Sequence, residues 1–558
     1  MNAAILFEPD GYLMTGPKLM GRQAAGDGFL RAAVKGHGGQ PLFAYTPRQA
    51  SAEAFRDRVA ELDPAAQIRW IHARRLEALG DVGVLYRPDH AIGLSARARL
   101  RAGLDRYAIC GVTHTLASAG AMDIIADLSV APVMPWDAIV CTSTAAVGVL
   151  ETALDAQDAY LKWRFGPAAA APRPMLPTIP LGAHCEDFAF TDDGRAGARA
   201  ALGLADDEVV GLFAGRLSFN GKAHPYPMYL ALQAAAERTG QRIVLVHAGQ
   251  FFNAAIEQGF RTAVARFCPD VRCVFIDGKD PTLYRQSWMA ADVFISLADS
   301  IQETFGITPV EAMAAGLPVV VTDWNGYKDT VRDGVDGFRL PTWQPAPGAG
   351  EPIARDYEVD AADYDLFLAR TSTAVSVELA PLIDRLCELV ATPDLRRRMG
   401  RSGQARAREL FDWAVIWPQY QALWAEQDAM RRRARAEHPA LFASAPAAAP
   451  SRPDPFAAFA HYPTARVDAD TPIALTPGAG PERYLSLAEH PLLSFFKLAP
   501  EPLEKVFAAL AGAATVRDLA GALGVRPEAV TEIVVRLAKM GLVELGPRRT
   551  FPGSPPRR

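Results

Sequence analysis

Cysteine is scarce in this chain, and the few cysteines form no pattern that would bridge them or hold a metal. Six cysteines are spread over 558 residues, without a Cys-x-x-Cys pair and without a paired histidine motif. Isolated thiols of this kind usually lie buried and behave as small hydrophobic side chains. We therefore expect free cysteines rather than a disulfide framework or a zinc site.

Long apolar runs and an excess of positive charge are also missing. No uncharged apolar run reaches the length of about 18 residues that a membrane-spanning helix needs, and no basic start followed by an apolar core marks a signal peptide. The formal net charge of −5 gives no electrostatic reason for general binding to nucleic acid. The sequence therefore predicts a cytoplasmic protein without a transmembrane segment, for which nucleic acid is not an expected partner.

What the sequence does contain is the composition and patterning of a folded α/β protein, with 50% hydrophobic and 22% charged residues. Short apolar runs alternate with amphipathic helical stretches in two series. In the first series, the expected strands are 3–7, 42–45, 68–70, 82–86, 107–112 and 138–141. In the second series, they are 209–214, 243–248, 271–276, 293–297 and 319–322. Such alternation predicts two doubly wound Rossmann-like domains facing across a cleft, with a ligand at the carboxyl ends of the strands.

The organisation along the chain follows from these series and from shifts in composition. The predicted boundaries are 1–205 for the first domain, 206–434 for the second, 435–483 for a linker rich in Ala and Pro, and 484–546 for a small, mostly helical module. The stretch 343–365, rich in Pro, Gly, Asp and Tyr, is expected to be an irregular insertion or a long surface loop.

The last module resembles a winged-helix domain. Three helical patterns precede a short strand pattern, at 502–511, 515–523, 527–540 and 541–545. Acidic residues outnumber basic ones over 484–546, and Glu528 and Glu532 lie near the start of the helix that would read bases. The charge disfavours DNA binding, so we prefer contact with a protein partner or a regulatory role.

Two glutamates with seven residues between them, Glu303 and Glu311, are the most informative feature. Their segment predicts a loop, a helix over 307–315 that Gly316 can close in the left-handed conformation, and then a buried strand. A loop that enters a helix offers unpaired backbone N–H groups to an anion, and carboxylates can bind hydroxyls beside it. Phosphate next to sugar hydroxyls describes a nucleotide sugar.

Two cations, Arg216 and Lys222, follow the expected strand 209–214, at the strand end where doubly wound sheets bind ligands. A nucleoside diphosphate that leaves a sugar builds up negative charge. Fixed cations can supply the stabilisation that a divalent metal gives in other enzymes. Both residues are therefore candidates for catalysis, against the alternative of solvated surface charges.

These segments together resemble the retaining glycosyltransferases of family 4 (group 1), which have the GT-B fold, over about residues 1–430. EAMAAGLPVVVTDWNGY continues the family's paired-glutamate signature, and VVGLFAGRLSFNGKAHP resembles its diphosphate-binding segment. WDAIVCTS and IPLGAHCEDF resemble the end of its N-terminal domain. The resemblance implies a metal-independent hexosyltransferase with a nucleotide-diphosphate sugar as donor, a glycan, lipid or small molecule as acceptor, and no further cofactor.

The resemblance also implies roles for residues of the second domain. Glu311 would bind the ribose hydroxyls and Glu303 would lie near the donor sugar. Backbone N–H groups around Phe305, Gly306 and Ile307 would meet the diphosphate or the sugar.

In the first domain, His114 in CGVTHTLAS matches a family histidine near the donor sugar and the acceptor. Its neutral ring could hydrogen-bond a hydroxyl without acting as a base. Gly21 can let backbone approach the phosphates, and Arg22 could contact donor or acceptor, although the glycines here do not form G-x-G-x-x-G. One departure concerns Lys222, which lies one residue further from Arg216 than in most members and so belongs to a longer loop.

Metal binding and two other functions are the remaining questions. An Asp-x-Asp metal motif should follow a strand, but 363–365 lies in the irregular stretch and 468–470 in the linker, so no metal is expected. A GT-B phosphorylase would need a cofactor-binding lysine that the sequence does not offer. A regulator that senses sugar nucleotides, with the last module binding DNA or protein, stays as the alternative from another class.

Overall fold

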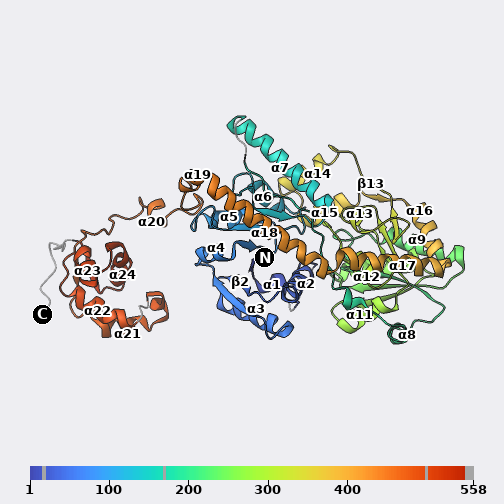
Figure 1. The fold of residues 1–558 in the computed structure, drawn as a ribbon, viewed down its shortest axis with the longest axis horizontal. Helices are drawn as coiled ribbons and strands as arrows, with labels where there is room; N and C mark the ends of the chain where they lie inside the picture. Colours follow the sequence, from blue (N-terminus) through green and yellow to red (C-terminus); the bar gives the residue numbers. More distant parts are fainter. Residues whose placement is uncertain (15–20, 168–170, 497–499, 547–558) are drawn as a thin grey trace. The chain divides into compact units, whose positions relative to one another are not determined.

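The computed structural model describes residues 1–14, 21–167, 171–496 and 500–546. The chain divides into two compact units, Met1–Pro450 and Ser451–Arg558, and each unit is described by itself. The first unit contains two six-stranded sheets (Figure 1).

The first domain is built on a parallel sheet with the order β3-β2-β1-β4-β5-β6. Its strands are β1 (Ala4–Leu6), β2 (Leu42–Thr46), β3 (Ile68–His72), β4 (Val84–Tyr86), β5 (Ala108–Val112) and β6 (Ala138–Val140). Its helices are α1 (Pro9–Tyr12), α2 (Gly21–Lys35), α3 (Gln49–Leu62), α4 (Leu79–Val82), α5 (Ile92–Arg99), α6 (Ala119–Asp127) and α7 (Thr144–Phe165). Side chains of β1 alternate between two cores, so the sheet is buried on both faces.

The second domain repeats this topology, with the order β12-β11-β10-β7-β8-β9. Its strands are β7 (Val209–Ala214), β8 (Ile243–Gly249), β9 (Arg272–Asp277), β10 (Val293–Ser296), β11 (Val319–Thr322) and β12 (Gly337–Leu340). Its helices are α8 (Asp192–Ala201), α9 (Tyr226–Thr239), α10 (Ala254–Phe267), α11 (Pro281–Ala290), α12 (Ile307–Ala314), α13 (Tyr327–Thr330), α16 (Leu379–Ala391) and α17 (Pro393–Arg406). Two cores again cover both faces of the sheet, which confirms the predicted pair of doubly wound domains.

The stretch 343–365, predicted as irregular, instead contains helix. Two short strands, β13 (Thr342–Trp343) and β14 (Ser376–Val377), pair antiparallel. Between them stand α14 (Glu351–Glu358) and α15 (Tyr364–Ser372), which we call the helical hairpin. α14 has no buried residue, and the Pro, Gly and Asp residues around it had favoured a loop.

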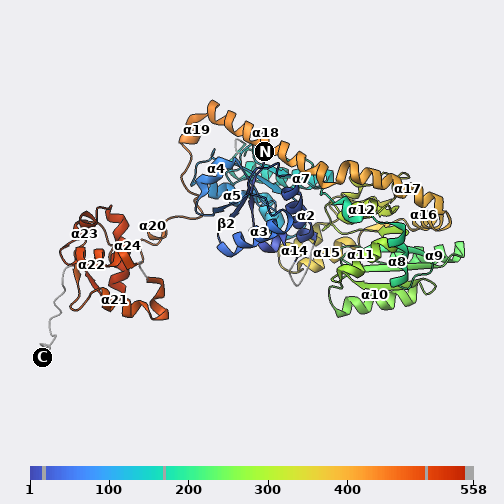
Figure 2. The ribbon, with the colours of Figure 1, turned by 60° about the horizontal axis from the view of Figure 1, so that its bottom comes forward.

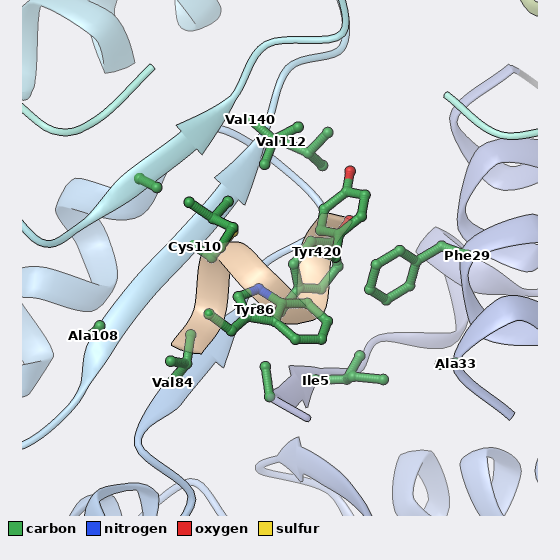
Figure 3. Packing of buried hydrophobic residues seen from close by; sticks show 14 of the residues in the cluster. Ile5, Phe29, Ala33, Val84, Tyr86, Ala108, Cys110, Val112, Val140 and Tyr420 are labelled. Atoms are coloured by element: carbon green, nitrogen blue, oxygen red, sulfur yellow. The ribbon is translucent and has the colours of Figure 1, made fainter. Parts of the chain in front are cut away.

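A long helix, α18 (Trp413–Glu437), returns from the second domain to the first after a π-helical turn at Ala407–Phe411 (Figures 1 and 2). Its aromatic side chains enter the first domain's core, where Tyr420 lies with Phe29 and Tyr86 (Figure 3). The approach is close, because a Cβ on Gly36 would lie 2.2 Å from Cδ1 of Trp417.

Two domain boundaries therefore differ from the prediction. α8, assigned to the first domain within 1–205, packs in a core of the second domain through Ala198. α18, assigned to the second domain within 206–434, packs on the first. Both segments lie where the chain crosses between the domains, and composition alone does not mark which core such a crossing helix joins.

The second unit has its own core around three helices. Its elements are α20 (Pro455–Ala458), β15 (Ile473–Leu475), α21 (Pro481–Ala488), α22 (Pro500–Leu510), α23 (Val516–Leu523), α24 (Pro527–Lys539) and β16 (Val543–Leu545). β15 pairs antiparallel with β16, so the module begins inside the stretch 435–483 that was predicted as linker. α19 (Pro439–Ala443), at the start of that stretch, packs through Phe442 against the first domain. The winged-helix assignment stays a prediction.

The cysteines are free, as expected, and four of the six are buried. Among the helices of the described ranges, none combines the length and the apolar character needed to cross a bilayer.

Candidate functional site

The second sheet reverses its strand order between β7 and β10, which are neighbours although β8 and β9 come between them in sequence. Such a switch point separates two connections that leave in opposite directions, and it is where open α/β sheets bind ligands. Arg216 and Lys222 follow β7, and Gln302 and Glu303 follow β10. The topology thus explains why residues distant in sequence meet here.

An ion pair joins the two strand ends. Nζ of Lys222 lies 2.5 Å from Oε2 of Glu303, and Nη2 of Arg216 donates to Oε1 of Gln302 at 3.2 Å. Burial raises the pKa of Glu303, but the charges of Lys222 and Arg216 and the N–H of Gly306 outweigh it and hold that pKa below its ordinary value. Glu303 is therefore a carboxylate at neutral pH, and the longer loop of Lys222 still brings it to this partner.

The helix α12 begins beside this pair with an uncapped N-terminus. Its N-cap is Gly306, with φ +75° and no side chain to accept from the first turn. A Cβ here would lie 2.1 Å from Cε1 of Tyr327, so both the backbone conformation and the space favour glycine. Phe305 is buried in the core, so its contribution to a ligand could come only from its backbone, whereas Ile307 is partly exposed.

The loop before α12 is held by the segment that follows β11. Nδ2 of Asn325 donates to the carbonyl of Glu303 at 3.1 Å, and Nε1 of Trp324 donates to that of Ser300 at 3.2 Å. A Cβ on Gly326 would lie 2.6 Å from Cα of Phe305. These contacts fix the position of the Glu303 carboxylate before any ligand arrives.

Glu311 lies one turn further along α12 and faces a separate cavity. It lines a cavity of about 190 Å³ together with Ile307 and first-domain residues that include Gly28 and Arg31. Burial raises the pKa of Glu311 to about 7, against a smaller opposing effect of Lys222. The structure thus places Lys222 where it acts on both glutamates, but only Glu303 is its ion-pair partner.

Asp299, in the loop that follows β10, is a buried carboxyl that connects this loop with the loop after β7. Its Oδ2 accepts from the backbone N–H of His224 at 3.3 Å, while Oδ1 has no hydrogen-bond partner among the described residues. Burial raises the pKa of Asp299 to about 7. The contact with His224 thus ties the loop after β7 to the loop after β10.

The first domain contributes groups of a different character. Nε2 of His114 lies 2.8 Å from the carbonyl of Pro88, and burial lowers the pKa of His114, so its ring is neutral at pH 7. Gly21 is the exposed first residue of α2. Arg22 pairs with Asp10 of its own domain at 2.5 Å, and both side chains are largely exposed. Residues 15–20 of the predicted glycine-containing loop lie outside the described ranges.

Three side chains that sequence reasoning missed connect the halves of the site. Ser143, the N-cap of α7, donates through Oγ to the carbonyl of Thr304 at 2.6 Å. Gln302 holds Arg216, and Tyr364 of the helical hairpin contacts both domains. For Ser143, the signal was its place at the end of the family-like segment WDAIVCTS, and for Tyr364 it was the tyrosine content of 343–365. No local pattern encodes contacts between distant segments.

Among the described residues, no cluster of three or more His, Cys, Asp or Glu side chains could hold a metal ion. The site is therefore described by its cations, its paired carboxylate and an open helix N-terminus. Two Rossmann-like domains with such a site at the second domain's switch point form the GT-B arrangement.

Comparison with known proteins agrees with this class. Residues 195–346 match the family model described as glycosyl transferases group 1.

Three curated relatives are named D-inositol 3-phosphate glycosyltransferase. The relative from Streptomyces bingchenggensis is 30% identical over 276 residues, covering 47% of this chain and 50% of its own. The relative from Nocardia farcinica is 31% identical over 191 residues, covering 32% and 40%. That from Mycobacterium tuberculosis is 32% identical over 151 residues, covering 26% and 29%. The chain thus spans half or less of each relative.

Solved structures with a similar fold include HepE from Anabaena in complex with UDP, at 16% identity and a TM-score of 0.49 over 76% of this chain and all of that one. Sucrose-phosphate synthase from Thermosynechococcus elongatus has 17% identity and a TM-score of 0.47, over 77% of this chain and 100% of its own.

Proposed function

We propose that this protein transfers a sugar from a nucleotide-diphosphate sugar to an acceptor, with retention of configuration and without a metal ion. The observation that carries the proposal is the group of Arg216, Lys222 and Glu303 around the switch point, beside the open N-terminus of α12. Its match to group 1 glycosyl transferases over 195–346 supports the same conclusion.

The cations would stabilise the diphosphate as it leaves. One unit charge pair at 4 Å is worth about 4 kcal/mol at an effective dielectric of 20, against about 1 kcal/mol in water. A half-buried and pre-positioned Arg216 beside Lys222 can therefore favour departure of the diphosphate without a Lewis acid.

A proton must leave the acceptor hydroxyl during transfer. Glu303 is held as a carboxylate by Lys222, and the half-buried ring of His114 is hydrogen-bonded to the carbonyl of Pro88, so neither is arranged as a free general base. The departing phosphate can accept the proton itself, on the face where the acceptor enters. This route is consistent with retention, in which the new bond forms on the same face.

The proposal also covers the acceptor, the cellular location and a protein partner. The curated relatives are named for D-inositol 3-phosphate, which makes that compound the first acceptor to test. We keep a cytoplasmic location and contact with a protein partner through the second unit as parts of the proposal. The alternative of a regulatory protein has no comparison in its favour.

A thermal-shift panel of UDP, GDP, ADP and their sugars tests the donor. A nucleotide at a hundredfold over its dissociation constant should stabilise the native protein by about 2.7 kcal/mol. An unchanged unfolding temperature with every nucleotide would overturn the proposal.

Two further measurements test its finer parts. The anomeric configuration of the product, read by NMR, should match that of the donor, and inversion would contradict retention. Turnover should persist after treatment with EDTA, whereas loss that a divalent cation restores would contradict metal independence.

A further inference from the structure

The helical hairpin of α14 and α15 is a small rigid unit added to the second domain. Nη1 of Arg370 lies 2.6 Å from Oδ2 of Asp356, which joins the two helices. The ring of Tyr357 stacks on that of Phe367, with centroids 4.4 Å apart and an interplanar angle of 17°. Its tyrosines are therefore held in defined orientations.

The hairpin reaches the first domain through two phenols. Oη of Tyr357 accepts from the backbone N–H of Ala119 at 2.8 Å. This N–H belongs to the first residue of α6 and has no partner within its own helix. Oη of Tyr364 lies 3.3 Å from Oγ1 of Thr115, the residue that follows His114. The two tyrosines thus contact the loop that carries the first domain's candidate residue.

Only one of these phenols continues to the cations. Burial raises the pKa of Tyr364, but the side chains of Gln302 and Arg216 lie close enough to its hydroxyl to oppose this shift. Oε1 of Gln302 accepts from Nη2 of Arg216 at 3.2 Å. Neighbouring polar side chains therefore lead from Thr115 through Tyr364 and Gln302 to Arg216. Orientation matters at such a cation, because a fixed donor stabilises developing charge without reorganising.

We propose that Tyr364 is a positioning residue that orients Arg216 through Gln302 and does so while it contacts Thr115. Contact between the domains and orientation of the cation are then coupled through one hydroxyl. This inference rests on the proposed function, since it requires that Arg216 faces a diphosphate.

The test compares Tyr364→Phe with Tyr357→Phe. Each variant loses one hydrogen bond between a phenol and the first domain and keeps its ring, so a role confined to holding the domains together would give similar effects. With UDP, GDP and ADP as probes in calorimetry, the dissociation constant for the bound diphosphate should rise about threefold to tenfold in Tyr364→Phe. It should stay within about twofold of the wild-type value in Tyr357→Phe, because the contacts of Tyr357 within the described ranges are with Ala119 and the hairpin's own rings rather than with Arg216.

A double-mutant cycle with Arg216→Gln makes the test specific. If Tyr364 acts through Arg216, the change Tyr364→Phe should have no further effect on diphosphate affinity once Arg216 is replaced. Additive effects, equal effects of the two tyrosine variants, or wild-type affinity in Tyr364→Phe would each overturn the inference and leave the proposed function standing. A wild-type protein that binds none of the three diphosphates would instead overturn the proposed function, and this inference with it.

Discussion

The two domains of the first unit repeat one strand order, but they bring different chemistry to the equivalent edge. In the second domain, Lys222 follows β7 and pairs with Glu303, which follows β10. In the first domain the equivalent strands are β1 and β4, and the loop after β4 contains an ion pair between Arg87 and Asp89. A pair between two strand ends fixes the geometry of a site, whereas a pair within one loop fixes only that loop.

This difference indicates that the two domains bind different parts of the substrates, although they share one fold. The second domain presents oriented charges suited to a diphosphate. The first domain presents neutral or solvent-exposed groups, namely His114 with its lowered pKa and Arg22 in an exposed ion pair. We therefore expect donor chemistry to depend on the second domain and acceptor contact on the first.

The largest expected effect separates the cations of the two domains. Arg216→Ala should lower the transfer rate by about 10²-fold to 10³-fold, because it removes a fixed charge next to the leaving group. Arg22→Ala should lower it by less than about tenfold, since an exposed charge is screened by water. Initial rates of nucleoside diphosphate release measure both. Equal losses in the two variants would refute the division between the domains.

The next effect separates the two glutamates within the second domain. Glu303→Ala should mainly slow transfer, because it leaves Lys222 without its partner near the reacting sugar. Glu311→Ala should mainly raise the donor dissociation constant, by about tenfold to a hundredfold, since it removes hydrogen bonds from hydroxyls to a charged group. Separate measurement of kcat and of donor affinity distinguishes them, and the reverse pattern would exchange their assigned roles.

The sequence predicted this second domain well because its strands are buried runs. β7 was predicted with its observed bounds, since all six of its residues are apolar or glycine and buried. β12 was missed, because a glycine and an arginine interrupt its four residues. Gly337 is required there, since a Cβ would lie 1.9 Å from the carbonyl oxygen of Val319, but this constraint appears only in three dimensions.

The site was predictable where strand ends determine it. Arg216 and Lys222 were proposed from their places after a strand, and Glu303 from its spacing to Glu311 in a loop before a predicted helix. The structure brings these three residues together. The contact between Thr115 and Tyr364 joins residues 249 positions apart, and no local pattern encodes it. Elements that bury an apolar face can be predicted from the hydrophobic pattern of the sequence, whereas contacts between domains depend on the assembled fold.

A smaller effect is expected from the first domain. His114→Ala should lower the transfer rate by about fivefold to tenfold, because it removes one hydrogen bond from a neutral ring. Burial lowers the pKa of His114 below its ordinary value, so the ring is uncharged above about pH 7. The ratio of wild-type to variant rates should therefore stay constant between about pH 7 and pH 8. A ratio that follows a titration in this interval would indicate an acid or base role.

The smallest expected effect is a change of donor affinity with pH, which depends on the ionisation of Glu311. Burial raises the pKa of this carboxyl from 4.5 to about 7, so the group is largely neutral below that value and ionised above it. A carboxylate accepts hydrogen bonds from hydroxyls more strongly than a neutral acid does. Affinity for the nucleotide sugar that the panel selects should therefore rise severalfold between about pH 6 and pH 8.

The raised pKa of Glu311 has the opposite effect on the stability of the protein without ligand, which falls as the pH rises. A carboxyl whose pKa is higher in the folded state stabilises the fold below its ordinary pKa, and this contribution is lost as the pH rises through about 7. Glu311→Gln should thus flatten both the rise in donor affinity and the accompanying decline in unfolding temperature. Asp299 titrates in the same interval, so Asp299→Asn is the matched control. If Asp299→Asn flattens the affinity profile and Glu311→Gln leaves it unchanged, the hydroxyl-binding role would be assigned to Asp299 instead of Glu311.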